Sequence, residues 1–321
     1  MIRILRRPAT LLIDAVLRMS GSFLYFLFRL FGWPFVARAG AVAGRMMYRL
    51  GSGRRRVTES AIRLLYRTGG PPPREIREIT ERSFANYYKR HVETVFFGCL
   101  DRRRIEEIVR VKGLEHVDEA LSKGKGVILL LSHFGSFLLP LPFLGYRGYK
   151  VNQVTGRQIH GSLLAERIWE WRRAEAEKLP VRFIQVGRFL RPLFEAFARN
   201  EMIAIAFDGR DGTTWADAEF FGGKVRFSTG PFDLARRTGA VIIPTFMVRR
   251  DDDTHLLVLE APFRLAAGGD QEAAAAADTR NFAELFAAYV GRYPCHFGMV
   301  LSGLFEEPVA RMDGFPMKIG G

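Results

Sequence analysis

Two polar segments of this chain follow apolar runs and carry residue types that suit acid–base chemistry. SHFGS at 132–136 follows GVILLL, and DGRDG at 208–212 follows MIAIAF. A histidine can take a proton from a hydroxyl when a carboxylate holds its ring in the correct tautomer. We therefore predict His133 as a general base and Asp208 as the carboxylate that orients it. In the competing interpretation, His133 hydrogen-bonds a loop and Asp208 caps a turn.

A serine nucleophile is a second possibility in the same segment. Ser132 and Ser136 lie on either side of His133. The sequence HFGSF lacks the GxSxG pattern that places a nucleophilic serine on a sharp, exposed turn. The general-base interpretation is therefore preferred.

Strands that alternate with helices must position these segments. The continuous apolar runs at 126–132, 202–207 and 241–250 are typical of strands buried on both faces. A further strand is expected at 256–263, and helices are expected at 162–178, 189–199, 227–239 and 271–292. This order predicts an α/β fold with a mixed, largely parallel sheet flanked by helices. Ligands bind such sheets at the carboxyl ends of the strands, where both polar segments lie.

Residues 1–50 are predicted to form amphipathic helices that associate with a membrane. The polar face is Asp14, Arg18, Ser22, Tyr25 and Arg29, and the opposite face is Leu12, Val16, Met19, Phe23, Phe26, Leu27 and Leu30. Only ten residues separate Arg18 from Arg29, whereas a spanning helix usually needs about 20 uncharged residues. An in-plane anchor is therefore expected. A buried hairpin that turns at Gly32 and Pro34 is the alternative.

The rest of the chain, 51–321, is predicted to be one α/β domain with a helical lead-in at 53–110 that is interrupted by PPP at 71–73. Arg3, Arg6 and Arg7 precede the anchor, and no small-residue cleavage site follows it. We therefore expect no cleaved signal peptide. The basic end should lie on the cytoplasmic face of a cell inner membrane, with the protein peripheral or held by a single anchor.

The charge balance favours an anionic partner. The 48 Lys and Arg against 34 Asp and Glu give a net charge of +14, which suits a membrane surface or an acidic carrier protein. Nucleic acid is not predicted as a partner, because the chain has no helix-turn-helix, zinc-finger or RNP pattern. Cys99 and Cys295 are too few for a disulfide framework, and the six histidines include no HExxH pair. No metal centre is expected.

Three segments carry a family resemblance: VKGLEHVDEALSKGKGVILLLSHFG, AIAFDGRDG and EFFGGKVRFSTGPFDLARRTGAVIIPTFMVRR. They resemble the lysophospholipid acyltransferase superfamily, in particular its lipid A late-acyltransferase branch and the related mycobacterial mannoside acyltransferases. The resemblance extends from Arg54 to Pro294. It implies a membrane-associated enzyme that moves a fatty acyl chain from a thioester, on acyl carrier protein or coenzyme A, to a hydroxyl of a glycolipid or lysophospholipid. No cofactor beyond that donor substrate is implied.

The family motif HxxxxD/E implies that His133 is the base, but its acidic position is Leu138 in this sequence. A leucine cannot orient an imidazole. Mycobacterial relatives resemble this chain in using a carboxylate from the downstream block, which implies that Asp208 takes the role. The alternative function is a catalytically impaired relative that binds lipid or a partner protein.

Such an enzyme also requires donors for an oxyanion and cations for substrate phosphates. Gly135 and Ser136 could supply backbone N–H groups at the start of a helix after His133. The cations predicted to bind substrate are Arg157, Arg210, Lys224 and Arg226. In the alternative interpretation, each of these cations is a solvated surface charge. The sequence leaves the acceptor, the acyl chain length and the oligomeric state open.

Overall fold

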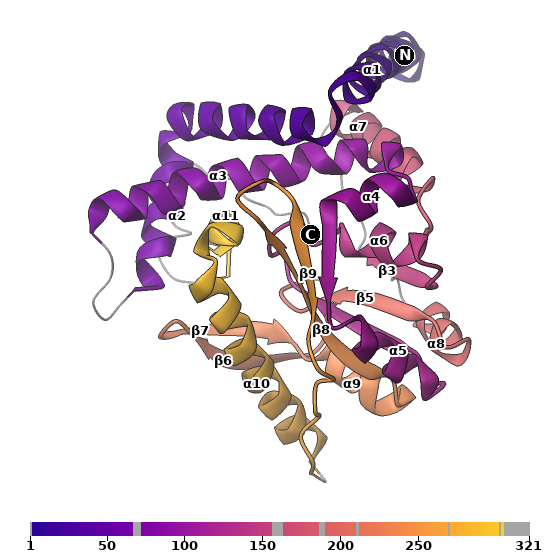
Figure 1. Cartoon of the computed structure of the whole chain (residues 1–321), viewed down its shortest axis with the longest axis vertical. Helices are drawn as coiled ribbons and strands as arrows, with labels where there is room; N and C mark the ends of the chain where they lie inside the picture. The colour runs from indigo at the N-terminus through magenta and orange to yellow at the C-terminus, as the bar shows by residue number, and fades with distance from the viewer. Residues whose placement is uncertain are drawn as a thin grey trace.

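A seven-stranded sheet lies at the centre of the computed structural model, which describes residues 2–66, 72–155, 163–185, 190–209, 212–268, 270–301 and 303–304. The strand order is β1-β9-β8-β2-β5-β3-β4 (Figure 1). The strands are β1 (Val109–Lys112), β2 (Val127–Leu131), β3 (Val151–Thr155), β4 (Val181–Gln185), β5 (Met202–Ala206), β8 (Val241–Arg249) and β9 (His255–Leu259). A separate antiparallel hairpin consists of β6 (Trp215–Phe220) and β7 (Gly223–Ser228).

The sheet is mixed and largely parallel, which confirms the predicted fold class. β2 pairs in parallel with both β5 and β8, and β3 pairs in parallel with both β5 and β4. The pairing between β8 and β9 is antiparallel, so β9 and its parallel neighbour β1 run against the other five strands. All five residues of β2 are buried, because this strand is central and covered on both faces.

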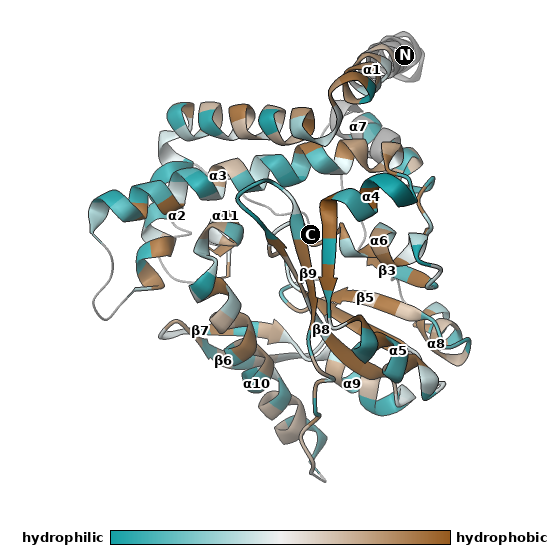
Figure 2. Cartoon of the chain, in the orientation of Figure 1, coloured by the Kyte–Doolittle hydropathy of each residue, from teal (hydrophilic) through white to brown (hydrophobic). Residues whose placement is uncertain are grey.

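Two helical layers cover the sheet and make two separate hydrophobic cores. Ile128 and Leu130 of β2 face one core, whereas Val127, Leu129 and Leu131 face the other. The first core includes side chains of α8 (Arg191–Ala198), α9 (Gly230–Thr238) and α10 (Gln271–Arg292). The second includes side chains of α4 (Arg102–Ile108), α5 (Leu114–Ser122) and α6 (Pro140–Tyr146). The neighbouring strands β5 and β8 are correspondingly among the most hydrophobic segments in Figure 2.

The helical lead-in contains α2 (Ser52–Leu64), α3 (Pro73–Phe96) and α4, and β1 begins at Val109, inside the range predicted to be helical. α7 (Leu163–Ala176) and α10 lie where helices are predicted. The predicted helix at 227–239 begins only at Gly230, since Phe227 and Ser228 belong to β7. Pro231 occupies the first turn of this helix, where its missing N–H costs nothing. The short η1 (Phe97–Cys99), η2 (Pro294–His296) and α11 (Gly298–Leu301) complete the elements.

The N-terminal segment α1 (Ile2–Leu50) consists of two helices joined by a kink at Gly32, where φ is 63° and ψ is −157°. The helix is thus interrupted at the position that the sequence indicates. After the kink it runs alongside α3 (Figure 1). The contact is close: a Cβ added at Gly40 would lie 2.4 Å from the Cα of Lys89, and one at Gly44 would lie 2.6 Å from the Cα of Ala85. Glycine at these positions therefore permits the two backbones to approach.

α1 also exposes a row of apolar side chains. Met19, Phe23, Phe26 and Leu30 are each more than half exposed, and their spacing puts them on one face of the helix. Among the described residues, the segment Tyr25–Leu50 is the one helix long and apolar enough to cross a membrane by length and composition. This row lies before the kink. After the kink Val36, Gly40 and Gly44 are buried, while Val42, Met46 and Leu50 are each more than half exposed.

Candidate active site

The pairing of β2 with β5 brings His133, the predicted base, and Asp208, its predicted partner, to one edge of the sheet. Leu131 of β2 lies opposite Ala206 of β5, and the Phe207 N–H donates to the Leu131 carbonyl at 2.8 Å. Because the strands are parallel and in register, both chains leave the sheet at the same level. His133 and Asp208, each two residues past the end of its strand, therefore lie side by side.

The Asp208 carboxylate receives three hydrogen bonds from His133. The His133 backbone N–H donates to both carboxylate oxygens at 3.1 Å, and the ring Nδ1 lies 3.1 Å from Oδ1. An ionised carboxylate can only accept, so Nδ1 carries the hydrogen. The Nε2 lone pair is then available to take a proton. The Asp208 side chain is 1 % exposed and the His133 side chain 37 % exposed, so the imidazole is accessible while the carboxylate is shielded from water.

Other side chains restrain the His133 loop. The Phe137 ring meets the imidazole edge-on, with the ring centroids 4.6 Å apart. The Arg90 guanidinium donates from Nη1 to the His133 carbonyl at 3.1 Å. Leu138, at the acidic position of the family motif, is only partly buried and packs against the second core. Position 138 therefore contributes to packing. The carboxylate beside His133 follows β5, the neighbour of β2 in the sheet.

Gly135 does not present a free N–H group. Its φ is +57°, its N–H donates to the His296 carbonyl at 3.1 Å, and a Cβ there would lie 2.1 Å from the Met247 carbonyl oxygen. This corrects the prediction that Gly135 binds an oxyanion, because the fold already uses its N–H. The following residues, 136–139, form a bend and a turn, and α6 begins at Pro140.

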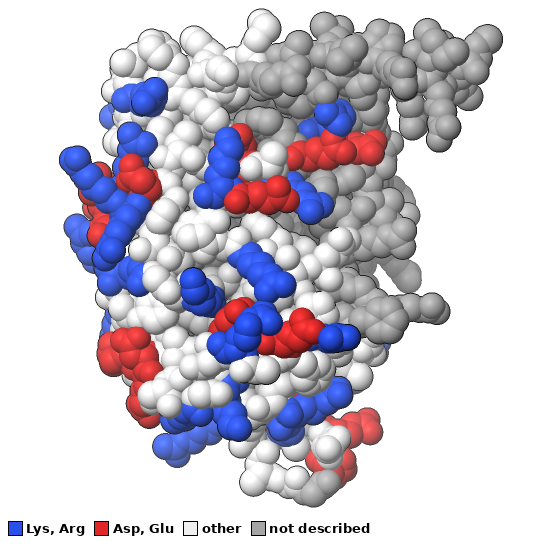
Figure 3. All heavy atoms as spheres, turned by 90° about the vertical axis from the view of Figure 1, so that its right-hand side faces the viewer, with Lys and Arg blue, Asp and Glu red and all other residues white. Residues whose placement is uncertain are grey.

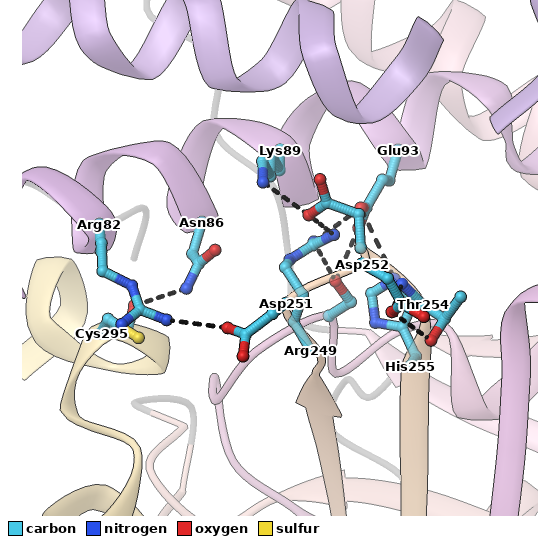
Figure 4. A network of polar contacts seen from close by, with 12 residues as sticks. Arg82, Asn86, Lys89, Glu93, Arg249, Asp251, Asp252, Thr254, His255 and Cys295 are labelled. Carbon is cyan, nitrogen blue, oxygen red and sulfur yellow. Dashed lines mark hydrogen bonds and ion pairs between the residues drawn. The ribbon is translucent and has the colours of Figure 1, made fainter. Parts of the chain in front are cut away.

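The Ser136 hydroxyl belongs to a buried polar network beneath the loop (Figure 4 shows the part around Glu93). It donates to Glu93 Oε2 at 2.6 Å and accepts from Arg249 Nη2 at 2.9 Å, while Arg249 also pairs with Glu93 at 2.6 Å. Burial alone would raise the pKa of Glu93. The Arg249 charge, the His255 ring 3.7 Å away and the hydrogen bond from Ser136 outweigh burial and hold that pKa below its usual range.

His296 completes the support of the loop from the other side. Its Nε2 accepts the Arg249 backbone N–H at 2.8 Å, and its ring stacks on Phe134 at a centroid distance of 5.1 Å. Burial, assisted by the Arg249 charge, lowers the pKa of His296 to about 3. The imidazole is therefore neutral at physiological pH, which agrees with a structural role in place of an acid–base role.

The predicted phosphate-binding cations fall into two groups. Arg157 and Arg210 lie outside the described residues. Lys224 and Arg226 lie on β7 and pair with Asp217 of β6 at 2.8 and 3.4 Å. Both of these cations thus already have a partner within the hairpin, and their contact with substrate stays a prediction. Across the described part of the chain, no group of three or more His, Cys, Asp or Glu is placed to hold a metal ion.

The sequence reasoning missed Arg90, Glu93, Arg249 and His255. A signal for two of them was present: the buried stripe of α3 runs through Ile76, Thr80, Ser83, Phe84, Arg90, Glu93 and Phe96. Charged residues on such a stripe require buried partners. The partners themselves could not be found, since Arg249 and His255 lie more than 150 residues away along the chain.

Comparison with known proteins finds a matching family model and similar proteins. The family model described as bacterial lipid A biosynthesis acyltransferase matches residues 7–302. A phosphatidylinositol mannoside acyltransferase of Mycolicibacterium smegmatis is 26 % identical over 263 residues, which cover 79 % of this chain and 83 % of that protein. The protein of the same description from Mycobacterium tuberculosis is 30 % identical over 188 residues, covering 56 % of this chain and 58 % of the relative.

Proposed function

The chain belongs to the bacterial lipid A biosynthesis acyltransferase family and is an acyltransferase, and from this premise we propose a specific reaction. The enzyme transfers a fatty acyl chain from a thioester, on acyl carrier protein or coenzyme A, to a hydroxyl of a membrane glycolipid or lysophospholipid. The observation that carries the proposal is the 3.1 Å contact between His133 Nδ1 and the buried Asp208 carboxylate. This contact leaves Nε2 as the base.

The reaction follows from that geometry. Nε2 takes the acceptor hydroxyl proton as the oxygen attacks the thioester carbonyl, which gives a tetrahedral oxyanion. Collapse of this intermediate breaks the carbon–sulfur bond. The proton on Nε2 then passes to the leaving thiolate, so the products are an ester and a free thiol. Throughout, the Asp208 carboxylate stabilises the imidazolium and keeps the ring oriented.

Membrane association supports a lipid acceptor. The exposed row Met19, Phe23, Phe26 and Leu30 could lie in the plane of a bilayer, with its apolar side chains in the acyl region. The net charge of +14 favours both anionic lipids and an acidic carrier protein. In Figure 3 the basic side chains are spread among acidic ones. On the face shown, the positive charge is therefore distributed and not gathered in one patch. We place this anchor at the cytoplasmic face of the inner membrane.

The relatives suggest which acceptor to test first. Both are phosphatidylinositol mannoside acyltransferases by name, so a phosphatidylinositol mannoside is the first glycolipid to offer, followed by lipid A precursors and lysophospholipids. Each acceptor would be incubated with full-length protein and either acyl-carrier-protein or coenzyme A thioesters. Mass spectrometry of the lipids would identify an acylated product.

Two substitutions test the dyad within that assay. His133→Ala should abolish turnover. Asp208→Asn keeps the shape of the side chain but removes the charge, and the corresponding change in serine proteases lowers kcat by about 10⁴-fold. Asp233→Asn, on α9, is the matched control and should retain turnover. Wild-type rates in both dyad variants would refute the proposed base.

A catalytically impaired, lipid-binding homologue is the alternative function, and Leu138 is the observation that favours it. The two functions differ in one outcome: vesicle binding without any acylated product from the full set of donors and acceptors supports the binding protein. Product formation that depends on His133 supports the enzyme.

A further inference from the structure

Helix α3 presents two charged side chains on successive turns to the loop that carries His133. Arg90 and Glu93 are three residues apart, so they lie on the same face of the helix. Their residues are 8 % and 0 % exposed. Charged groups buried to this degree require compensating contacts. Arg90 contacts the loop, and Glu93 contacts both the loop and Arg249 of β8.

Arg90 holds the main chain of His133. Its Nη1 donates to the His133 carbonyl at 3.1 Å, and its guanidinium lies over two aromatic rings, 4.9 Å from the centroid of Tyr87 and 5.3 Å from that of Phe137. Phe137 in turn contacts the imidazole. The His133 N–H is bonded to Asp208, so both polar groups of this residue's backbone are fixed, one by Asp208 and one by Arg90.

The charge on Arg90 also acts on the same site. Burial lowers the pKa of this guanidinium, while Tyr87, Asp208 and Glu93 oppose that change. An arginine remains protonated under such conditions. A fixed positive charge therefore lies near the carboxylate that must stay ionised in order to orient His133.

Glu93 holds the other end of the segment. It accepts from the Ser136 hydroxyl at 2.6 Å and pairs with Arg249, which itself donates to the same hydroxyl at 2.9 Å. Ser136 is thus both donor and acceptor among buried partners. Figure 4 shows Glu93 reaching from α3 toward Arg249 at the end of β8 and His255 at the start of β9.

We propose that Arg90 and Glu93 are positioning residues for the acyl transfer reaction: from successive turns of α3 they fix the two ends of the segment 133–136 and so hold the His133 imidazole in the productive orientation. The inference rests on the proposed function, since it assigns His133 as the base. Displacement of a reacting group by about 1 Å can cost about 10²-fold in rate. Neither residue contacts substrate in this role.

Four variants of the full-length protein test the proposal through steady-state kinetics. Arg90→Gln should lower kcat by about 10²-fold with little change in KM, because binding of the substrate is untouched. Arg90→Lys should recover part of the rate, since lysine keeps the charge but not the planar stack. Ser136→Ala removes the hydroxyl bond to Glu93 and leaves the Glu93–Arg249 pair intact, so a smaller fall in kcat is expected. Arg74→Gln, exposed at the start of α3, is the control and should behave as wild type.

Heteronuclear NMR of the histidine rings supplies a readout that does not depend on activity. The His133 signals, assigned by comparison with His133→Gln, should show the Nδ1–H tautomer in the wild-type protein and a mixture of tautomers in Arg90→Gln. A structural role alone would lower stability without moving this signature. The measurement also separates the two proposals: if His133→Ala retains turnover, the proposed base is wrong, yet the tautomer still reports whether Arg90 orients the ring.

Three results would overturn the inference. These are a wild-type kcat in Arg90→Gln, a lowered kcat with an unchanged His133 tautomer, or a fall in kcat that Arg74→Gln shares. If Arg90→Gln does not fold, the milder Arg90→Lys and Ser136→Ala decide, and wild-type kcat in both refutes the positioning role.

Discussion

The carboxylate that serves His133 comes from a neighbouring strand and not from the motif position five residues along the chain. Leu138 packs against the second core, whereas Asp208 lies 3.1 Å from the imidazole. An acid on an adjacent parallel strand reaches the ring because the ends of β2 and β5 are level. At the scale of single residues, the sequence lacks an acid at position 138, and the structure places the carboxylate of Asp208 beside His133 instead.

This replacement predicts that an acid restored at position 138 will not help. The double variant Asp208→Asn with Leu138→Asp should be as slow as Asp208→Asn alone, because the side chain at 138 faces the core. It should also unfold at lower urea concentration, since a carboxylate there loses water without gaining a partner. Recovery of turnover in the double variant would show that position 138 can reach His133.

At the scale of elements, α1 has two different halves. The half before Gly32 exposes a row of apolar side chains, whereas the half after it packs on α3 through Gly40 and Gly44. The second half also exposes Val42, Met46 and Leu50 on another face. α3 in turn carries the side chains that contact the His133 loop. The exposed apolar segment and the loop that carries His133 are therefore joined through one intervening helix.

The close contact between α1 and α3 predicts that replacing a helical glycine with alanine will lower the free energy of unfolding. Alanine in place of glycine within an exposed helix stabilises by up to about 1 kcal/mol, but Gly44→Ala would place its Cβ 2.6 Å from the Ala85 Cα. Overpacking of this kind costs about 1–3 kcal/mol. Urea unfolding should therefore show that Gly44→Ala is destabilised. Gly291→Ala on α10, where the nearest atom is 3.8 Å away, is the control and should be neutral or stabilised.

We predict that charged substitutions in the exposed apolar row before the kink will weaken binding to membranes. Phe23→Glu with Phe26→Glu should reduce flotation with anionic vesicles, because both rings are more than half exposed and their loss removes apolar area from the bilayer contact. Leu190→Glu, an exposed apolar residue at the start of α8, is the matched control and should float normally. Equal binding by the double variant and the control would exclude this face as the anchor.

At the scale of the whole molecule, buried ionisable groups make stability depend on pH. Burial lowers the pKa of His255 and lowers that of His296 to about 3, while the Arg249 charge helps to hold the Glu93 pKa below its usual range. In the unfolded chain a histidine titrates at a pKa of about 6.5. Below that pH the unfolded state binds more protons than the folded state, so acid favours unfolding.

The free energy of unfolding should therefore be highest above pH ~7 and fall as the pH drops toward ~4, with each histidine contributing a slope of up to about 1.4 kcal/mol per pH unit. His296→Gln keeps an acceptor for the Arg249 N–H but cannot take a proton. Urea unfolding at several pH values should show a shallower acid limb for this variant. The same slope in both proteins would mean that His296 does not titrate on unfolding.

Much of the fold follows from local patterns. The continuous apolar runs that become β2, β5 and β8 predict strands buried on both faces, and the helical period at 271–292 predicts α10. Several strands were missed: β1 begins inside the range predicted to be helical, β4 has only five residues, and the strands β6 and β7 lie beside a segment with strong helix signals. The position of His133 and Asp208 just after strand ends could also be predicted from the sequence, because both follow apolar runs.

By itself, then, the sequence determined the fold class, the candidate base and acid, and the family resemblance, all of which depend on residue type and short-range spacing. The tertiary structure alone decided that Asp208 contacts His133 while Leu138 packs against the second core. It also decided that the Gly135 N–H donates to His296 and that Arg90 and Glu93 hydrogen-bond the loop. These contacts join residues 43 or more positions apart. Strand pairing and helix packing bring such residues together, and short-range spacing does not specify which distant elements meet.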